Sequence, residues 1–268
     1  MNIKKAVLPV AGIGSRFMPA TKVVPKELLP IVDKPVIQYL VEEAIMSGIE
    51  EVIFVISKDK ELIKDHFSEN LWLEELLKKR GKKKPLQKIQ PIHKMAKFTY
   101  VYQNAPLGDG HAILMAEEAV GNEPFLVLFG DDIVKGEIPA AKQLINHFKG
   151  ESIIAVEKIP KEKTSMYGVI DPVLQSDKFF EVKDMVEKPS PDKAPSDLGV
   201  IGKYICPPEI FDAIKEANTG KDGEIRLIDG FIRLKEKQKI WAVEIEGDRF
   251  DTGNPEGLID ASHAFLVK

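Results

Sequence analysis

The chain has 268 residues, of which 44% are hydrophobic, and this is enough for one large α/β domain or a domain with an elaborated half. Its 38 Lys and Arg residues against 42 Asp and Glu give a formal net charge of -4, which excludes an overall basic field that would gather nucleic acid. The single cysteine, Cys206, excludes an internal disulfide and a CxxC metal site. The apolar stretch in MNIKKAVLPVAG is too short for a membrane span. We therefore expect a cytoplasmic protein.

Apolar runs of strand length alternate with helical patterns along the first part of the chain. The runs cover residues 6–11, 52–56, 98–102, 125–129 and 153–156. Between the first two, residues 35–48 form the clearest helical pattern, with Pro35 at a first position and Gly48 just after the end. This alternation predicts an α/β fold whose mainly parallel sheet is covered by helices on both faces.

A glycine-containing turn follows the first predicted strand. Gly12 and Gly14 stand where the chain leaves the carboxyl edge of the sheet, the edge at which open α/β sheets bind ligands. The spacing does not fit a dinucleotide fingerprint, because Phe17 occupies the place of the third glycine, and no Gly-Lys pair is followed by Ser or Thr as in a P-loop. An isolated GxG is more often only a tight turn.

Cations favour a phosphate site at this turn. Arg16 carries a planar, permanently charged fork that suits phosphate oxygens, and Lys22 and Lys26 follow within the same loop. Such a density of cations is costly unless it faces an anion. We therefore interpret the turn as a triphosphate cradle.

Adjacent carboxylates end the predicted strand over 125–129. Asp131 and Asp132 repel each other unless a cation or N–H groups offset the charge, and Mg²⁺ is commonly held by one or two carboxylates with substrate phosphate oxygens. A turn or helix cap is an equally good interpretation of an isolated Asp-Asp pair. If the strand continues, Asp132 points away from Asp131 and only orients its neighbours.

The second half of the chain has a different sequence pattern, in which strand-like segments follow one another. From Tyr167, the strand-like pieces YGVIDPV, FFEVKDMVEKP and GVIGKYICP follow one another with short breaks and indicate an antiparallel or mixed addition to the sheet. A helix over 208–218, a strand over 240–245 and a last helix from about Pro255 complete the chain. We interpret the basic run KKRGKKK at 78–84 as a solvated helix end, since no aromatic residues interleave it.

Motifs along nearly the whole chain carry a family resemblance. GIGSR at 12–16, PKE at 25–27 and DKP at 33–35 resemble the signature of the sugar-nucleotide pyrophosphorylases. Further stretches keep the order of that family: PLGDGHA at 106–112, FGDD at 129–132, YGVI at 167–170, DMVEKP at 184–189, GEI at 223–225 and FDTG at 250–253. The resemblance implies a Rossmann-like nucleotidyltransferase fold, with a mainly parallel mixed sheet flanked by helices and a smaller antiparallel elaboration on the sugar side.

The same resemblance implies the domain plan and the reaction. We expect a single domain with a nucleotide-binding half over 1–150, a sugar-binding half over 151–254 and a C-terminal helix over 255–268. The stretch over 19–39 is most similar to the bacterial members that use UTP and glucose 1-phosphate, which implies a Mg²⁺-dependent uridylyl transfer giving UDP-glucose and pyrophosphate. A thymidylyltransferase for a hexose 1-phosphate and a non-catalytic sugar-nucleotide-binding regulator are the alternatives. We expect no nucleic-acid or membrane partner, and a homodimer or homotetramer for which exposed Phe265 and Leu266 of the last helix offer a contact.

Site roles follow from the resemblance, residue by residue. It assigns catalysis to the cations Arg16, Lys26 and Lys188. It assigns nucleotide binding to Ala11, Gly12, Gly14, Gln103, Gly108 and Asp131, with the Gln103 amide on the imide edge of the base. It assigns sugar binding to Gly168, Glu187, Lys188 and the backbone at Val200, and Mg²⁺ binding to Asp131 and Asp251. We expect His111 to support the helix after PLGDGH, since the reaction needs no general base.

The chain departs from the usual family pattern at several positions. These are Ser15, Asp109, Asp197, Arg226 and Ile228. Asp109 near the base loop and Asp197 near the sugar loop each add a charge, so the preferred base and sugar are less determined than the reaction class.

Overall fold

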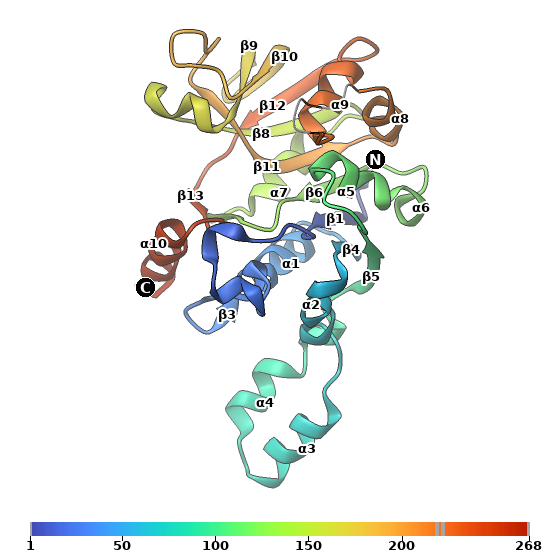
Figure 1. Ribbon diagram of the computed structural model, residues 1–268, viewed down its shortest axis with the longest axis vertical. Helices are drawn as coiled ribbons and strands as arrows, with labels where there is room; N and C mark the ends of the chain where they lie inside the picture. Colours follow the sequence, from blue (N-terminus) through green and yellow to red (C-terminus); the bar gives the residue numbers. More distant parts are fainter. Residues whose placement is uncertain (1, 218–219, 221–222, 267–268) are drawn as a thin grey trace.

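The computed structural model describes residues 2–217, 220 and 223–266. Within these residues the centre of the molecule is one nine-stranded sheet (Figure 1). Its strands are β1 (Lys5–Pro9), β4 (Glu51–Ile56), β5 (Lys97–Tyr102), β6 (Phe125–Leu128), β8 (Ser152–Lys158), β9 (Gly168–Ser176), β10 (Phe179–Glu187), β11 (Leu198–Cys206) and β12 (Ile240–Glu244). Two-stranded sheets join β2 (Pro30–Ile31) to β3 (Lys34–Pro35) and β7 (Asp132–Lys135) to β13 (Asp248–Asp251).

The strand order is β5-β4-β1-β6-β11-β8-β12-β10-β9. Strands β5, β4, β1 and β6 pair in parallel, as do β8 and β12, whereas β10 and β11 run against their neighbours. This arrangement confirms the predicted mixed sheet with an antiparallel addition. Since parallel strands end at one edge, the turn after β1 and the acidic pair after β6 lie side by side there.

Helices cover both faces of the sheet. They are α1 (Val36–Met46), α2 (Glu61–His66), α3 (Leu71–Lys79), α4 (Lys83–Ile89), α5 (Asp109–Met115), α6 (Glu117–Val120), α7 (Ala140–His147), α8 (Glu209–Glu216), α9 (Leu227–Leu234) and α10 (Pro255–Leu266). Alternate strand residues enter two separate apolar cores, one with α1 and α7 and one with α5, α8 and α9. The predicted first helix is confirmed, but it begins at Val36, and Pro35 precedes it as the last residue of β3.

Helices α3 and α4 form an arm that extends away from the sheet (Figure 1). The basic run over 78–84 lies at its tip and is solvent-exposed, as the sequence predicts. Among the described residues, no helix combines the length and apolarity that a membrane crossing requires.

Candidate active site

A cavity of about 920 Å³ receives residues from both halves of the chain. Of the residues to which the family resemblance assigns a role, seven line it: Arg16, Asp131, Gly168, Glu187, Lys188, Val200 and Asp251. The first two follow the carboxyl ends of β1 and β6, and the others come from the antiparallel half and from β13. The fold therefore brings a phosphate-type loop, an acidic pair and the expected sugar residues around one space.

Lys26 and Asp131 form an ion pair beside this cavity. Lys26 Nζ donates to Asp131 Oδ2 at 2.6 Å, and both side chains are three-quarters buried or more. Burial alone would raise the pKa of Asp131, but Lys26, with Arg249 and Arg16, holds it below its ordinary value. Asp131 is thus a carboxylate, and Lys26 is a cation whose pKa is raised by Asp131 and Glu27 against the opposing effect of burial.

A second ion pair, between Glu27 and Lys60, lies next to Lys26. Glu27 Oε2 accepts from Lys60 Nζ at 2.8 Å, and both side chains are almost fully buried. Burial raises the pKa of Glu27 and lowers that of Lys60, so each charge depends on the other. A Cβ on Gly130 would stand 3.0 Å from the Glu27 side chain, so the glycine lets this turn pack closely on the end of β6.

Asp131 and Asp251 face the same spot although 120 positions separate them. Strand β13 pairs with β7 so that Asp251 lies opposite Asp132, and the Thr252 N–H and hydroxyl both donate to the Asp131 carbonyl oxygen, at 2.8 Å and 2.9 Å. A Cβ on Gly253 would stand 2.5 Å from Asp131 Oδ2 and 2.9 Å from Asp251 Oδ1. Two carboxylates that face one point match a hard cation shared with substrate phosphates.

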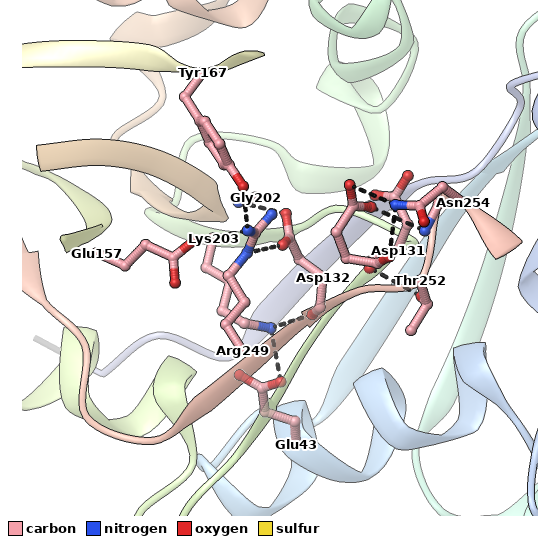
Figure 2. Close-up of polar contacts among 12 residues, drawn as sticks. Glu43, Asp131, Asp132, Glu157, Tyr167, Gly202, Lys203, Arg249, Thr252 and Asn254 are labelled. Carbon is pink, nitrogen blue, oxygen red and sulfur yellow. Dashed lines mark hydrogen bonds and ion pairs between the residues drawn. The ribbon is translucent and has the colours of Figure 1, made fainter. Parts of the chain in front are cut away.

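Asp132 turns into the protein, away from this spot (Figure 2). Its Oδ2 accepts the Gly202 N–H at 2.7 Å, and its Oδ1 accepts from Arg249 Nε. Arg249 also donates to Glu157 Oε1 at 2.8 Å and to the Tyr167 hydroxyl at 3.2 Å. Sequence reasoning missed Arg249, although it precedes Asp251 by two positions and so shares its face of β13.

A buried lysine holds the backbone of the acidic pair. Lys203 has no exposed side-chain surface, and its Nζ donates to Glu43 Oε2 at 2.8 Å and to the Asp132 carbonyl oxygen at 2.9 Å (Figure 2). Glu43 Oε1 in turn accepts the Ala141 N–H at 2.9 Å. Strand β11 is therefore bonded directly to the residue that follows Asp131, and helices α1 and α7 are linked to that residue through Lys203 and Glu43.

The sugar-side residues stand at the end of β10. Glu187 is the last residue of this strand, and Lys188 follows with a left-handed φ of 47°. The two side chains meet, with Lys188 Nζ 3.4 Å from Glu187 Oε1. The Lys188 N–H donates to the Tyr167 carbonyl oxygen at 3.0 Å, which links this turn to the residue that also binds Arg249. A Cβ on Gly168 would stand 3.2 Å from Glu187 Oε2, so glycine leaves room for the carboxylate.

A second cavity, of about 390 Å³, contains Gln103 and Ala11. Gln103 Nε2 donates to the Gly108 carbonyl oxygen at 3.0 Å and to His111 Nδ1 at 2.9 Å, which orients the amide. Burial lowers the pKa of His111, as suits a neutral acceptor. With both amide hydrogens engaged, the Gln103 carbonyl oxygen is the group suited to accept a hydrogen bond from a base.

The loop over 106–110 joins the two halves of the molecule. Ile225 N donates to the Leu107 carbonyl oxygen at 2.8 Å, and Gly110 N donates to the Ile225 carbonyl oxygen at 2.9 Å. Gly108 has a φ of +101°, and a Cβ there would stand 2.4 Å from that same Ile225 oxygen. Glycine is therefore required at Gly108 by its conformation and by this contact.

The remaining predicted residues line neither of these two cavities. Gly12 has open space around its Cβ position, whereas Gly14 has a φ of +66° and its carbonyl oxygen accepts from the Thr21 hydroxyl at 2.7 Å. Lys22 is exposed on the same loop and lines neither cavity.

Two expectations need correction. Asp197 is exposed and outside the cavity, so it adds no charge to the sugar site, whereas Asp109, Arg226 and Ile228 line it. Phe265 is half-buried and not exposed as expected, because its ring packs against Tyr39 at 4.9 Å and Phe250 at 6.2 Å between centroids.

Comparisons with known proteins agree along the whole chain. A family model described as Nucleotidyl transferase matches residues 5–267. The UTP--glucose-1-phosphate uridylyltransferase of Bacillus subtilis (strain 168) is 44% identical over 269 residues, covering 100% of this chain and 92% of the relative. A solved UDP-glucose pyrophosphorylase complexed with UDP-glucose has a TM-score of 0.90 and 41% identity over 98% of both chains. The UTP-bound UGPase from Acinetobacter baumannii has a TM-score of 0.92 and 35% identity over 98% of this chain and 93% of its own.

Proposed function

The chain belongs to the nucleotidyl transferase family, and we propose that it transfers the uridylyl group of UTP to glucose 1-phosphate, giving UDP-glucose and pyrophosphate. One observation carries this proposal. The carboxylates of FGDD and FDTG converge on a cavity that also receives Glu187 and Lys188 from the antiparallel half. A phosphate-activating site and a sugar-phosphate site therefore share one space.

The reaction is an in-line displacement between two anions. A phosphate oxygen of glucose 1-phosphate attacks the α-phosphorus of UTP, the bond from that phosphorus to the bridging oxygen of the β-phosphate breaks, and pyrophosphate leaves. The attacking phosphate is already ionised at neutral pH, so no general base is required. Catalysis is then mostly positioning and neutralisation of charge.

The cations of the site divide this work. Arg16 binds the β- and γ-phosphates, and Lys26, held by Asp131, stabilises charge around the reacting phosphorus. Lys188 binds the phosphate of the sugar substrate, while Glu187 accepts from sugar hydroxyls. The backbone of Ala11, Gly12 and Gly108 contacts the nucleotide. The Gln103 side chain, in the second cavity, hydrogen-bonds to the base.

We propose Mg²⁺ as the cofactor, held by Asp131 and Asp251 together with substrate phosphate oxygens. The fit rests on the two carboxylate oxygens that face the same spot beside Gly253. When bound, the ion supplies Lewis acidity and charge neutralisation to the reacting phosphate.

A substrate-matrix assay tests the function. Pyrophosphate release is measured with Mg²⁺ for UTP and dTTP against glucose 1-phosphate and other hexose 1-phosphates. The expected result is the highest kcat/KM for UTP with glucose 1-phosphate. A preference for dTTP would establish a thymidylyltransferase instead, and binding of UDP-glucose without turnover of any pair would establish a non-catalytic regulator.

We also propose a homodimer or homotetramer that works in the cytoplasm. An apolar groove of about 380 Å³ between α10 and the β2–β3 hairpin exposes Val32, Ile259 and Leu266, which suits burial against a second copy. The single cysteine, Cys206, is buried and unpaired, which suits a reducing compartment. Light scattering should give a dimer or tetramer mass for the wild type and a monomer mass for Ile259→Glu.

A further inference from the structure

Asp109 is a carboxylate in the sugar end of the large cavity that the proposed reaction does not use. It is the first residue of α5, and it lines the cavity together with Glu187, Tyr204 and Arg226. Its Oδ1 accepts the Leu227 N–H at 2.7 Å, at the first turn of α9. The side chain is thereby held in place by an element that itself forms a wall of the cavity.

The charge around Asp109 is unusual for a site that binds a phosphorylated sugar. The pKa of Asp109 is raised to about 6, mainly by burial and with a smaller contribution from the charge of Glu187, while the Leu227 N–H and, more weakly, Arg226 act in the opposite direction. Arg226 also lies 3.6 Å from Glu224, so its charge is shared with another carboxylate. This end of the cavity therefore holds two carboxylates, Asp109 and Glu187, of which Glu187 has its own counter-charge because Lys188 Nζ lies 3.4 Å from its Oε1.

Such an environment discriminates among sugars by charge. A carboxylate accepts hydrogen bonds from hydroxyl or ammonium groups, and it repels another carboxylate brought into the same desolvated space. A sugar that Glu187 binds occupies the cavity that Asp109 also lines, so a charged group on the sugar meets both acidic side chains.

We propose that Asp109 is a specificity-determining residue, which accepts a hydrogen bond from the sugar and selects neutral or amino-substituted hexose 1-phosphates against those that carry a carboxylate. This inference rests on the proposed function, because it assumes that the sugar phosphate binds beside Glu187 and Lys188. It adds a second sugar-facing carboxylate to that site and defines the substrate class by its charge.

The test compares three sugar phosphates of similar shape and different charge. Wild type and Asp109→Asn are assayed with UTP and glucose 1-phosphate, glucosamine 1-phosphate or glucuronic acid 1-phosphate at about pH 7.5, where a carboxyl group of pKa about 6 is ionised. A charged sugar that turns over poorly is measured as a competitive inhibitor of glucose 1-phosphate turnover. Asparagine keeps an oxygen that accepts the Leu227 N–H, so the contact with α9 is retained.

Relative to glucose 1-phosphate, Asp109→Asn should weaken glucosamine 1-phosphate about 10-fold and strengthen glucuronic acid 1-phosphate about 10-fold, with the KM for UTP unchanged. Opposite shifts report a charge at the sugar and are not produced by a loss of structure. The matched control is Asp197→Asn, which makes the same change on an exposed residue outside the cavity and should leave all ratios as in wild type.

If the three sugar phosphates shift alike in Asp109→Asn while wild type still makes UDP-glucose, Asp109 only supports α9 and the inference is wrong. If wild type releases no pyrophosphate from UTP with any of the three, the proposed function fails, and the inference fails with it.

Discussion

Asp131 and Asp251 are chemically alike but hold different partners, so the same substitution to asparagine should have different effects on stability. Asp131→Asn removes the charge that Lys26 contacts at 2.6 Å, in a pair whose side chains are only 20% and 25% exposed. Leaving Lys26 partly buried without its ion pair should lower the free energy of unfolding by about 1–3 kcal/mol. In Asp251→Asn, the amide oxygen can still accept the Gly253 N–H, which now lies 2.9 Å from Asp251 Oδ1, so the loss should be below about 1 kcal/mol.

Activity should fall in both variants despite this difference. Each substitution removes one of the two carboxylates that face the proposed Mg²⁺ position, and the loss of several kcal/mol of charge stabilisation corresponds to about 10²–10⁴-fold in kcat. The double variant should be little slower than the worse single variant, because residues that act on one ion as a unit are not additive.

Two measurements check this reasoning. Urea unfolding gives the stabilities, and pyrophosphate release across a Mg²⁺ titration gives kcat. The pKa of Asp131 is held below its ordinary value in the folded protein, so the stability advantage of wild type over Asp131→Asn should be complete at neutral pH and disappear as the pH falls through that lowered pKa. Near wild-type turnover of Asp251→Asn at ordinary Mg²⁺, or two losses that simply multiply, would refute a shared metal site.

Three further substitutions test other parts of the structure. Lys203→Met should lower the free energy of unfolding by about 3–5 kcal/mol in urea titrations, because Glu43 is left buried without its counter-charge. Gln103→Ala should reduce the preference for UTP over CTP in competitive assays more than it lowers kcat with UTP, since the base edge loses a directed acceptor far from the reacting phosphorus. Tyr167→Phe should raise the KM for glucose 1-phosphate about 2–10-fold with little change in the KM for UTP. The substitution removes the hydroxyl that accepts from Arg249, and this contact helps to hold the Tyr167 carbonyl oxygen that accepts the Lys188 N–H.

Lys203→Met has a matched comparison, and each of the other two substitutions has an outcome that would contradict it. Lys215→Met breaks an ion pair with Glu117 whose side chains are 48% and 42% exposed, so it should cost less than about 1 kcal/mol, and an equal cost for Lys203→Met would contradict its buried role. An unchanged UTP preference in Gln103→Ala would remove that residue from the base site. Equal increases in both KM values for Tyr167→Phe would mean that Tyr167 supports the fold and not the sugar side.

Much of the architecture follows from local sequence patterns. A local pattern depends only on the environment of one element, so the element can be predicted without the rest of the chain. This holds for the apolar strand runs, the helical repeat over 36–46 and the three strand-like pieces from Tyr167 onwards. The glycine turn, the acidic pair and FDTG are compact motifs, and the family resemblance supplied the roles that spacing alone left open between a ligand site and a turn.

Only the tertiary structure decided which residues meet. Arg249 is 117 positions from Asp132 and 82 from Tyr167, and no periodicity relates positions so far apart, so its contacts exist only once β13 has paired with β7. The burial of Lys203 and the side-chain bond from Asp109 to the backbone of Leu227 arise in the same way, from strands and loops brought together by the sheet order. Sequence patterns report the environment of each element, but the charges that surround a side chain come from distant segments. For that reason the surroundings of Asp109 could be learned only from the folded chain.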